Sequence, residues 1–137
     1  MKNVIRFFFL LILVFTFSCE ETGLFVNCSD CVFDEPLKAN LEIKVQPVYL
    51  AINLVKVFEG NLEDNILFGT YQANSGTLNI WVPLNKKYTL TATYSISGTK
   101  YIAVDSATPG VKYTKNECDD PCYFVYDRFI DLRLKSY

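Results

Sequence analysis

The sequence predicts an all-β fold: a single antiparallel β-sandwich of seven or eight short strands, preceded by a signal-peptide helix. After residue 40, apolar and polar residues alternate with period two through most of the chain, as in strands with one buried face. Turn-forming Gly, Pro and Asn residues separate these stretches, and no segment beyond residue 18 keeps a helical period with caps. The length of 137 residues indicates one domain.

The first 18 residues have the features of a secretory signal peptide. Lys2 and Arg6 supply positive charge, and between Phe7 and Phe17 a single residue is not apolar. This run of about eleven residues is too short for a bilayer, which takes roughly 20 residues of helix. It matches the apolar region of an export signal, so we assign residues 1–18 to the signal peptide.

Ser18 directly precedes Cys19 at the end of this segment. A small residue before a cysteine at this place resembles the lipobox of bacterial lipoproteins, and the Phe-rich form ending in Ser-Cys resembles that of Bacteroidetes-type bacteria. The resemblance implies lipidation of Cys19 and anchoring at the bacterial outer membrane, on the periplasmic face or the cell surface. Thr16 and Phe17 depart from the usual pattern, which has a leucine and a small residue there. An ordinary cleaved signal, or an uncleaved anchor, is the alternative.

Charge and composition narrow the function classes. Without residues 1–18 the chain has 119 residues and a net charge of about −4, so no nucleic-acid partner is expected. The chain has no histidine, which excludes the Ser-His-Asp triad, the Cys-His pair and the His-based zinc hydrolases. Nothing in the spacing singles out a pair of carboxylates for hydrolysis. We therefore expect no enzyme activity and no cofactor.

The exported chain divides into a tether and a domain. Residues 19–40 show little periodicity and contain the first cysteine pair, Cys28 and Cys31, so we predict a lipid-anchored tether there. The β-sandwich domain is expected over residues 41–137.

Four strands are expected in the first half of the domain. Residues 41–46 alternate apolar with charged or polar side chains, whereas 49–58 are mostly apolar on both faces, as in a central strand. Residues 66–71 form a shorter run. Residues 77–82 alternate again and place Trp81 on the polar face.

The second half of the domain contains the clearest strand. Residues 88–96 alternate between a face with two tyrosines and a face of Thr and Ser, so the tyrosines are expected in the core. Residues 97–99, Ser-Gly-Thr, supply a tight turn, and 100–104 return as the hairpin partner. Further strands are expected at 123–126 and 130–135, where alternation resumes.

Residues 55–94 resemble the transthyretin-like or carboxypeptidase-regulatory-like sandwiches. Those families pass from a short apolar strand through Val-Pro and a turn residue to Tyr-x-Leu, as residues 82–83 and 88–90 do here. Asn85 stands where a turn glycine is usual, and asparagine tolerates the left-handed conformation. The resemblance implies a sandwich of that type, with an immunoglobulin-like sandwich as the alternative, and it carries little about function.

The four cysteines other than Cys19 form two close pairs, Cys28 with Cys31 and Cys118 with Cys122. An even number in an exported chain indicates two disulfides, with three possible connectivities. We favour bridges from one pair to the other, which would fasten the tether to the end of the sandwich. The alternative is a zinc site of all four thiolates, for which the spacing is suitable.

Trp81 is the single tryptophan of the chain. An outward ring among polar residues can stack on a sugar or a partner protein, but packing under a loop or on the second sheet is the commoner arrangement and the one expected here. Together these features predict a non-enzymatic envelope lipoprotein with a binding, adhesion or accessory role. Its expected partners are the membrane, through the lipid, and an envelope protein or carbohydrate. A small zinc-binding lipoprotein is the alternative.

Overall fold

The computed structural model describes residues 27–47, 52–73 and 76–135, so the predicted signal peptide and Cys19 lie outside the described residues. Within these ranges the chain forms nine strands and two one-turn 3-10 helices, which confirms the all-β class. No helix in the described ranges is long and apolar enough to cross a membrane.

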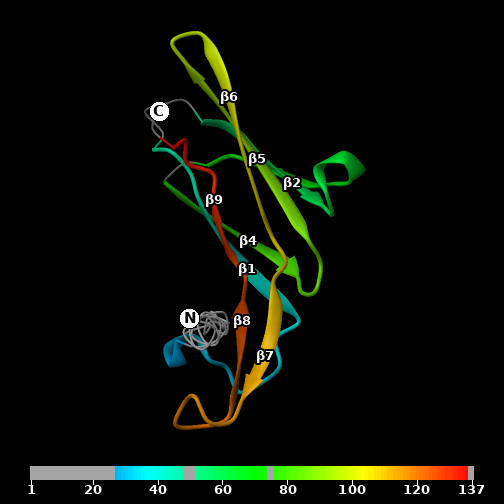
Figure 1. Cartoon of the computed structure of the whole chain (residues 1–137), viewed down its shortest axis with the longest axis vertical. Coiled ribbons are helices and arrows are strands. Elements are labelled where there is room, and N and C mark those ends of the chain that lie inside the picture. Colours follow the sequence, from blue (N-terminus) through cyan, green and yellow to red (C-terminus); the bar gives the residue numbers. More distant parts are fainter. Residues whose placement is uncertain (1–26, 48–51, 74–75, 136–137) are drawn as a thin grey trace, which may run out of the picture.

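The strands form two larger sheets and a separate hairpin (Figure 1). The three-stranded sheet has the order β4 (Thr77–Pro83), β1 (Lys38–Lys44), β9 (Phe129–Asp131). The four-stranded sheet has the order β3 (Leu67–Tyr71), β2 (Ile52–Glu59), β5 (Tyr88–Ile96), β6 (Thr99–Ala107). The hairpin pairs β7 (Gly110–Thr114) with β8 (Cys122–Tyr126), and the 3-10 helices are η1 (Cys28–Asp30) and η3 (Leu62–Asp64).

The two larger sheets enclose one hydrophobic core. Period-two alternation turns Leu41 and Ile43 of β1 inward, and it turns Leu90 of β5 inward from the other sheet. Tyr88 and Tyr94 are fully buried in the same cluster, as predicted. The arrangement is a sandwich because each sheet covers the apolar face of the other.

Residues with positive φ make the tight turns. Ser97 and Gly98 have φ of 51° and 82°, the combination that a two-residue hairpin turn between twisted strands requires. Asn85 has φ of 60°, so the turn expected between β4 and β5 uses the left-handed conformation that asparagine tolerates. Both turn predictions are confirmed.

Several features differ from the strand prediction. β9 ends at Asp131, whereas a strand was expected to run to residue 135, and β6 runs from Thr99 to Ala107, beyond the predicted residues 100–104. β7 was not expected, because Pro109-Gly110 indicated only a turn, yet Gly110 is the first residue of the strand. β1 begins at Lys38, so the first strand includes the last residues of the predicted tether. β9 pairs in parallel with β1, with Ile43 opposite Ile130, within an otherwise antiparallel sandwich.

Candidate functional site

The four described cysteines meet at the end of the β7–β8 hairpin. Cys28 in η1 is bonded to Cys118 in the turn that follows β7, and Cys31 is bonded to Cys122, the first residue of β8. Each bridge has a Cα–Cα separation of 5.7 Å, within the usual range for disulfides. The prediction that one pair is bridged to the other is confirmed, and the structure selects one of the two cross-linked connectivities.

Further contacts hold the N-terminal segment, residues 27–37, against the hairpin. Val32 and Tyr123 exchange two backbone hydrogen bonds, of 2.9 and 2.7 Å. Nη2 of Arg128 lies 3.1 Å from a carboxylate oxygen of Asp30. Figure 1 shows this blue segment alongside β8. Covalent, backbone and ionic contacts together make the N-terminal segment a fixed part of the surface.

The cysteine cluster is also the place for the zinc alternative. The sulfur atoms of Cys31, Cys118 and Cys122 lie within 4.8 Å of one another. Zinc binds thiolates, and a disulfide sulfur carries no such charge. The zinc alternative therefore applies to the chain with its four cysteines reduced.

A cavity of about 260 Å³ lies where the N-terminal segment meets the outer face of the three-stranded sheet. We call it the Trp81 cavity, and its lining residues are Asp30, Val32, Pro36, Lys38, Asn40, Trp81, Val125 and Arg128. The lining residues of the Trp81 cavity therefore come from the N-terminal segment, from β1 and β4, and from β8 and the residues just after it.

Trp81 is 65% exposed, so the expectation that its ring packs under a loop or on the second sheet is wrong. β4 turns Ile80 and Val82 into the core, which leaves Trp81 on the outer face. The register of β1 and β4 places Asn40 directly opposite Trp81. The indole is thus an accessible apolar surface beside an amide.

Two polar side chains of the Trp81 cavity have distinctive surroundings: one is held by its contacts, and the other has an acceptor without a partner. The guanidinium of Arg128 lies over the ring of Phe129, 4.8 Å from its centroid, while it contacts Asp30, and its side chain is only 20% exposed. Oδ1 of Asn40 is buried and has no hydrogen-bond partner among the described residues. A buried acceptor without a donor is uncommon in folded proteins, and it can mark a site for a ligand or water.

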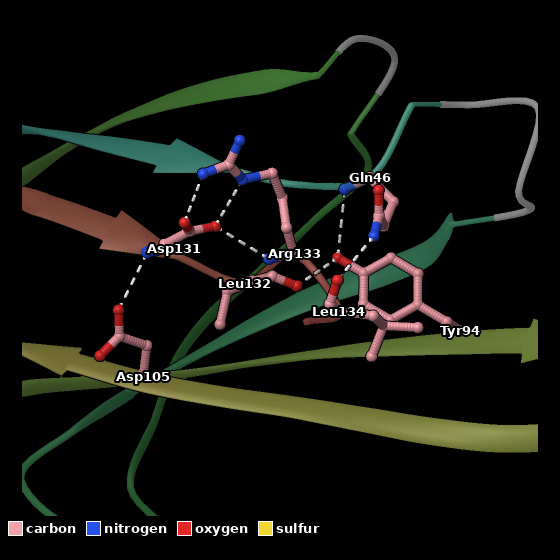
Figure 2. Close-up of polar contacts among 7 residues, drawn as sticks. All are labelled: Gln46, Tyr94, Asp105, Asp131, Leu132, Arg133 and Leu134. Atoms are coloured by element: carbon pink, nitrogen blue, oxygen red, sulfur yellow. Dashed lines mark hydrogen bonds and ion pairs between the residues drawn. The ribbon is translucent and has the colours of Figure 1, made fainter. Parts of the chain in front are cut away.

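Figure 2 shows a second polar cluster, which includes Asp105 of β6, Asp131 of β9 and Arg133 just after β9. Arg133 donates from Nε and Nη2 to the two carboxylate oxygens of Asp131, at 2.8 and 2.6 Å. The backbone N–H of Asp131 donates to Oδ2 of Asp105 at 2.9 Å, which ties β9 of one sheet to β6 of the other. These residues also line an open hollow of about 550 Å³.

Tyr94 makes a second hydrogen-bonded contact between the two sheets (Figure 2). Its hydroxyl, on β5, donates to the carbonyl of Leu132 at 2.6 Å and accepts from the backbone N–H of Gln46 at 3.4 Å. The side-chain amide of Gln46 donates to the carbonyl of Leu134 at 3.2 Å. Burial, the largest effect, raises the pKa of Tyr94, so its hydroxyl stays protonated and able to donate.

The second polar cluster has a structural role. Hydrogen bonds from Arg133, the largest effect, lower the pKa of Asp131 to about 2. At neutral pH this carboxylate has no proton to donate, whereas a general acid needs a raised pKa. The interactions shown in Figure 2 therefore join the two sheets and do not form an acid–base pair.

The lowered pKa of Asp131 predicts a specific pH dependence. Its pKa is below the ordinary value of 3.8, so the carboxylate stabilises the fold above about pH 4 and loses this contribution as the pH falls through about 2. We expect Asp131→Asn to flatten the fall in the free energy of unfolding over that interval. The effect should be small, because exposed ion pairs contribute little. Urea unfolding measured at a series of pH values checks this, with the exposed Asp34→Asn as the control. An unchanged slope in Asp131→Asn would contradict the assignment.

Sequence reasoning missed part of the Trp81 cavity. Asp30 and Asn40 belonged to the predicted tether, and Arg128 stood outside every predicted strand. The available signal was an outward tryptophan, but the residues around it come from segments about 40 to 50 positions away on either side. Their proximity depends on strand pairing and on the disulfides.

No protein-family model, curated protein or solved structure matches the chain. The candidate site therefore rests on its own geometry.

Proposed function

We propose that this chain is a non-enzymatic binding module of the bacterial cell envelope, anchored at the outer membrane through a lipid on Cys19. The two disulfides, which join residues 90 and 91 positions apart, are the observation that carries the proposal. Disulfides of this kind persist in oxidising compartments and are rare in the cytosol. The export signal and the lipobox resemblance of residues 1–19 support the same location.

Binding is favoured over catalysis by the chemistry of the side chains. The chain has no histidine, and the carboxylate of Asp131 is held ionised by Arg133. The Trp81 cavity, in contrast, combines an exposed aromatic ring with the guanidinium of Arg128, which its contacts hold in place. Specific binding sites commonly have an apolar surface with a few oriented polar groups.

Metabolic labelling with a fatty acid tests the anchor. The full chain, produced in a bacterium with an outer membrane, should incorporate the label and separate with the outer-membrane fraction. Cys19→Ser should lose the label, whereas Cys28→Ser, the control, should keep it. Wild-type protein without label, or a Cys19→Ser variant that retains it, would overturn the lipid anchor. Protease treatment of intact cells then separates display on the cell surface from a periplasmic location.

A four-cysteine zinc protein is the second candidate, because the sulfur atoms already lie close together. Metal analysis of protein purified under reducing conditions distinguishes the two. One zinc per chain would favour the second candidate. A mass increase on reduction that corresponds to four hydrogen atoms, with no bound metal, would favour the disulfide-bonded module.

A further inference from the structure

We infer that the Trp81 cavity binds a saccharide, with one sugar ring stacked on the indole of Trp81 and its hydroxyls directed to Asn40 and Arg128. This inference assigns a site and a ligand class to the binding module, and it rests on the function proposed above.

The exposed indole suits the apolar face of a sugar ring. A pyranose presents C–H groups on its faces and hydroxyls around its edge, so it needs a flat apolar surface bordered by hydrogen-bonding groups. Trp81 is 65% exposed and supplies that surface. Asn40 lies opposite Trp81 in the strand register, and Arg128 lines the same cavity. A single sugar ring can therefore contact both the apolar indole and the polar side chains.

The polar groups match hydroxyls in particular. Asn40 lines the cavity, and its side-chain amide can pair with a hydroxyl either as a donor or as an acceptor. The guanidinium of Arg128 has five N–H donors in a planar fork, and its contact with Asp30 is made through Nη2. Phe129 and Asp30 hold this fork in place, so less side-chain freedom is lost on binding.

The size of the cavity favours a small ligand over a protein partner. Its volume of about 260 Å³ lies just below the roughly 300–1,000 Å³ of small-molecule sites, as expected for one or two sugar units. Asp30, Lys38 and Arg128 line the cavity together with the indole. A saccharide tolerates charged neighbours because its hydroxyls both donate and accept.

The disulfides hold one wall of this site. Asp30 and Val32 lie in the N-terminal segment, which is fixed by the Cys28–Cys118 and Cys31–Cys122 bridges. Reduction frees that wall to move away from Trp81, so saccharide affinity should fall under reducing conditions.

The single tryptophan makes the site directly observable, because all tryptophan emission of the chain comes from Trp81. The full exported chain, in a detergent without a sugar headgroup, is titrated with soluble hexose, N-acetylhexosamine and uronic-acid oligosaccharides. We expect at least one of these to produce a saturable change in emission. Calorimetry with the same oligosaccharide should then show Trp81→Ala at least about tenfold weaker. Asn40→Ala should also be weaker, and Phe33→Ala, an exposed aromatic outside the cavity lining, should be unchanged.

Two results would overturn the inference: emission that no oligosaccharide changes, or binding that is equally tight in Trp81→Ala. Near-ultraviolet circular dichroism confirms that each variant is folded. If protein that carries lipid on Cys19 binds no saccharide, this inference is wrong and the lipid anchor stands. If the protein lacks the lipid label but still binds a saccharide, the lipid anchor is wrong and this inference stands. The two failures are therefore distinguishable.

Discussion

Removal of both disulfides together is expected to lower the free energy of unfolding by about 7 kcal/mol, whereas removal of either one should cost about 2–3 kcal/mol. The reason is geometric. While one bridge remains, the second closes only a small ring of about nine residues, from 28–31 and 118–122. When both are gone, the unfolded chain also regains the freedom of a loop of about 90 residues, worth about 4–5 kcal/mol in the chain-entropy model.

Urea unfolding of three variants measures these costs: Cys28→Ala with Cys118→Ala, Cys31→Ala with Cys122→Ala, and all four substitutions together. Domains of this size are stabilised by roughly 5–15 kcal/mol, so the fourfold variant should be close to unfolded at 37 °C. Wild-type protein under a reductant is the control and should behave like the fourfold variant. Costs that add, with the fourfold loss equal to the sum of the two others, would contradict this account.

Tyr94→Phe is expected to lower the free energy of unfolding by about 1–3 kcal/mol. The change removes only the hydroxyl, yet it leaves the carbonyl of Leu132 without its donor at 2.6 Å and the N–H of Gln46 without its acceptor. The contact with Leu132 is buried, so water does not readily replace the lost hydrogen bond. The substitution should weaken the contact between the two sheets, since β5 belongs to one sheet and Leu132 follows β9 of the other.

Tyr88→Phe is the matched control. Tyr88 is also fully buried, but its hydroxyl donates to the carbonyl of Pro83, at 3.1 Å, in a contact that is only partly buried. Its removal should cost about 0.5–1.5 kcal/mol. Equal losses in the two variants, measured by urea unfolding at pH 7, would show that the tie between Tyr94 and Leu132 does not contribute in the expected way.

Local patterns predicted the individual strands well where one face is buried. Residues 88–96 were expected as a strand with those bounds, because alternating tyrosines and threonines report which side faces the core. The turns at Ser97-Gly98 and Asn85 were predictable from the few residue types that tolerate positive φ. β7 was missed, because its first residue, Gly110, also forms part of a turn signal.

The sequence by itself determined that the chain is all-β, which faces its main strands bury, and that two cysteine pairs lie near the two ends of the exported part. Only the tertiary structure decided that β9 pairs in parallel with β1, which bridge each cysteine makes, and that Trp81 stays exposed beside Asn40 and Arg128. The physical reason is that alternation reports the environment of a residue within its own strand. Pairing between strands depends on packing among residues some 90 positions apart, and a local pattern does not contain that information.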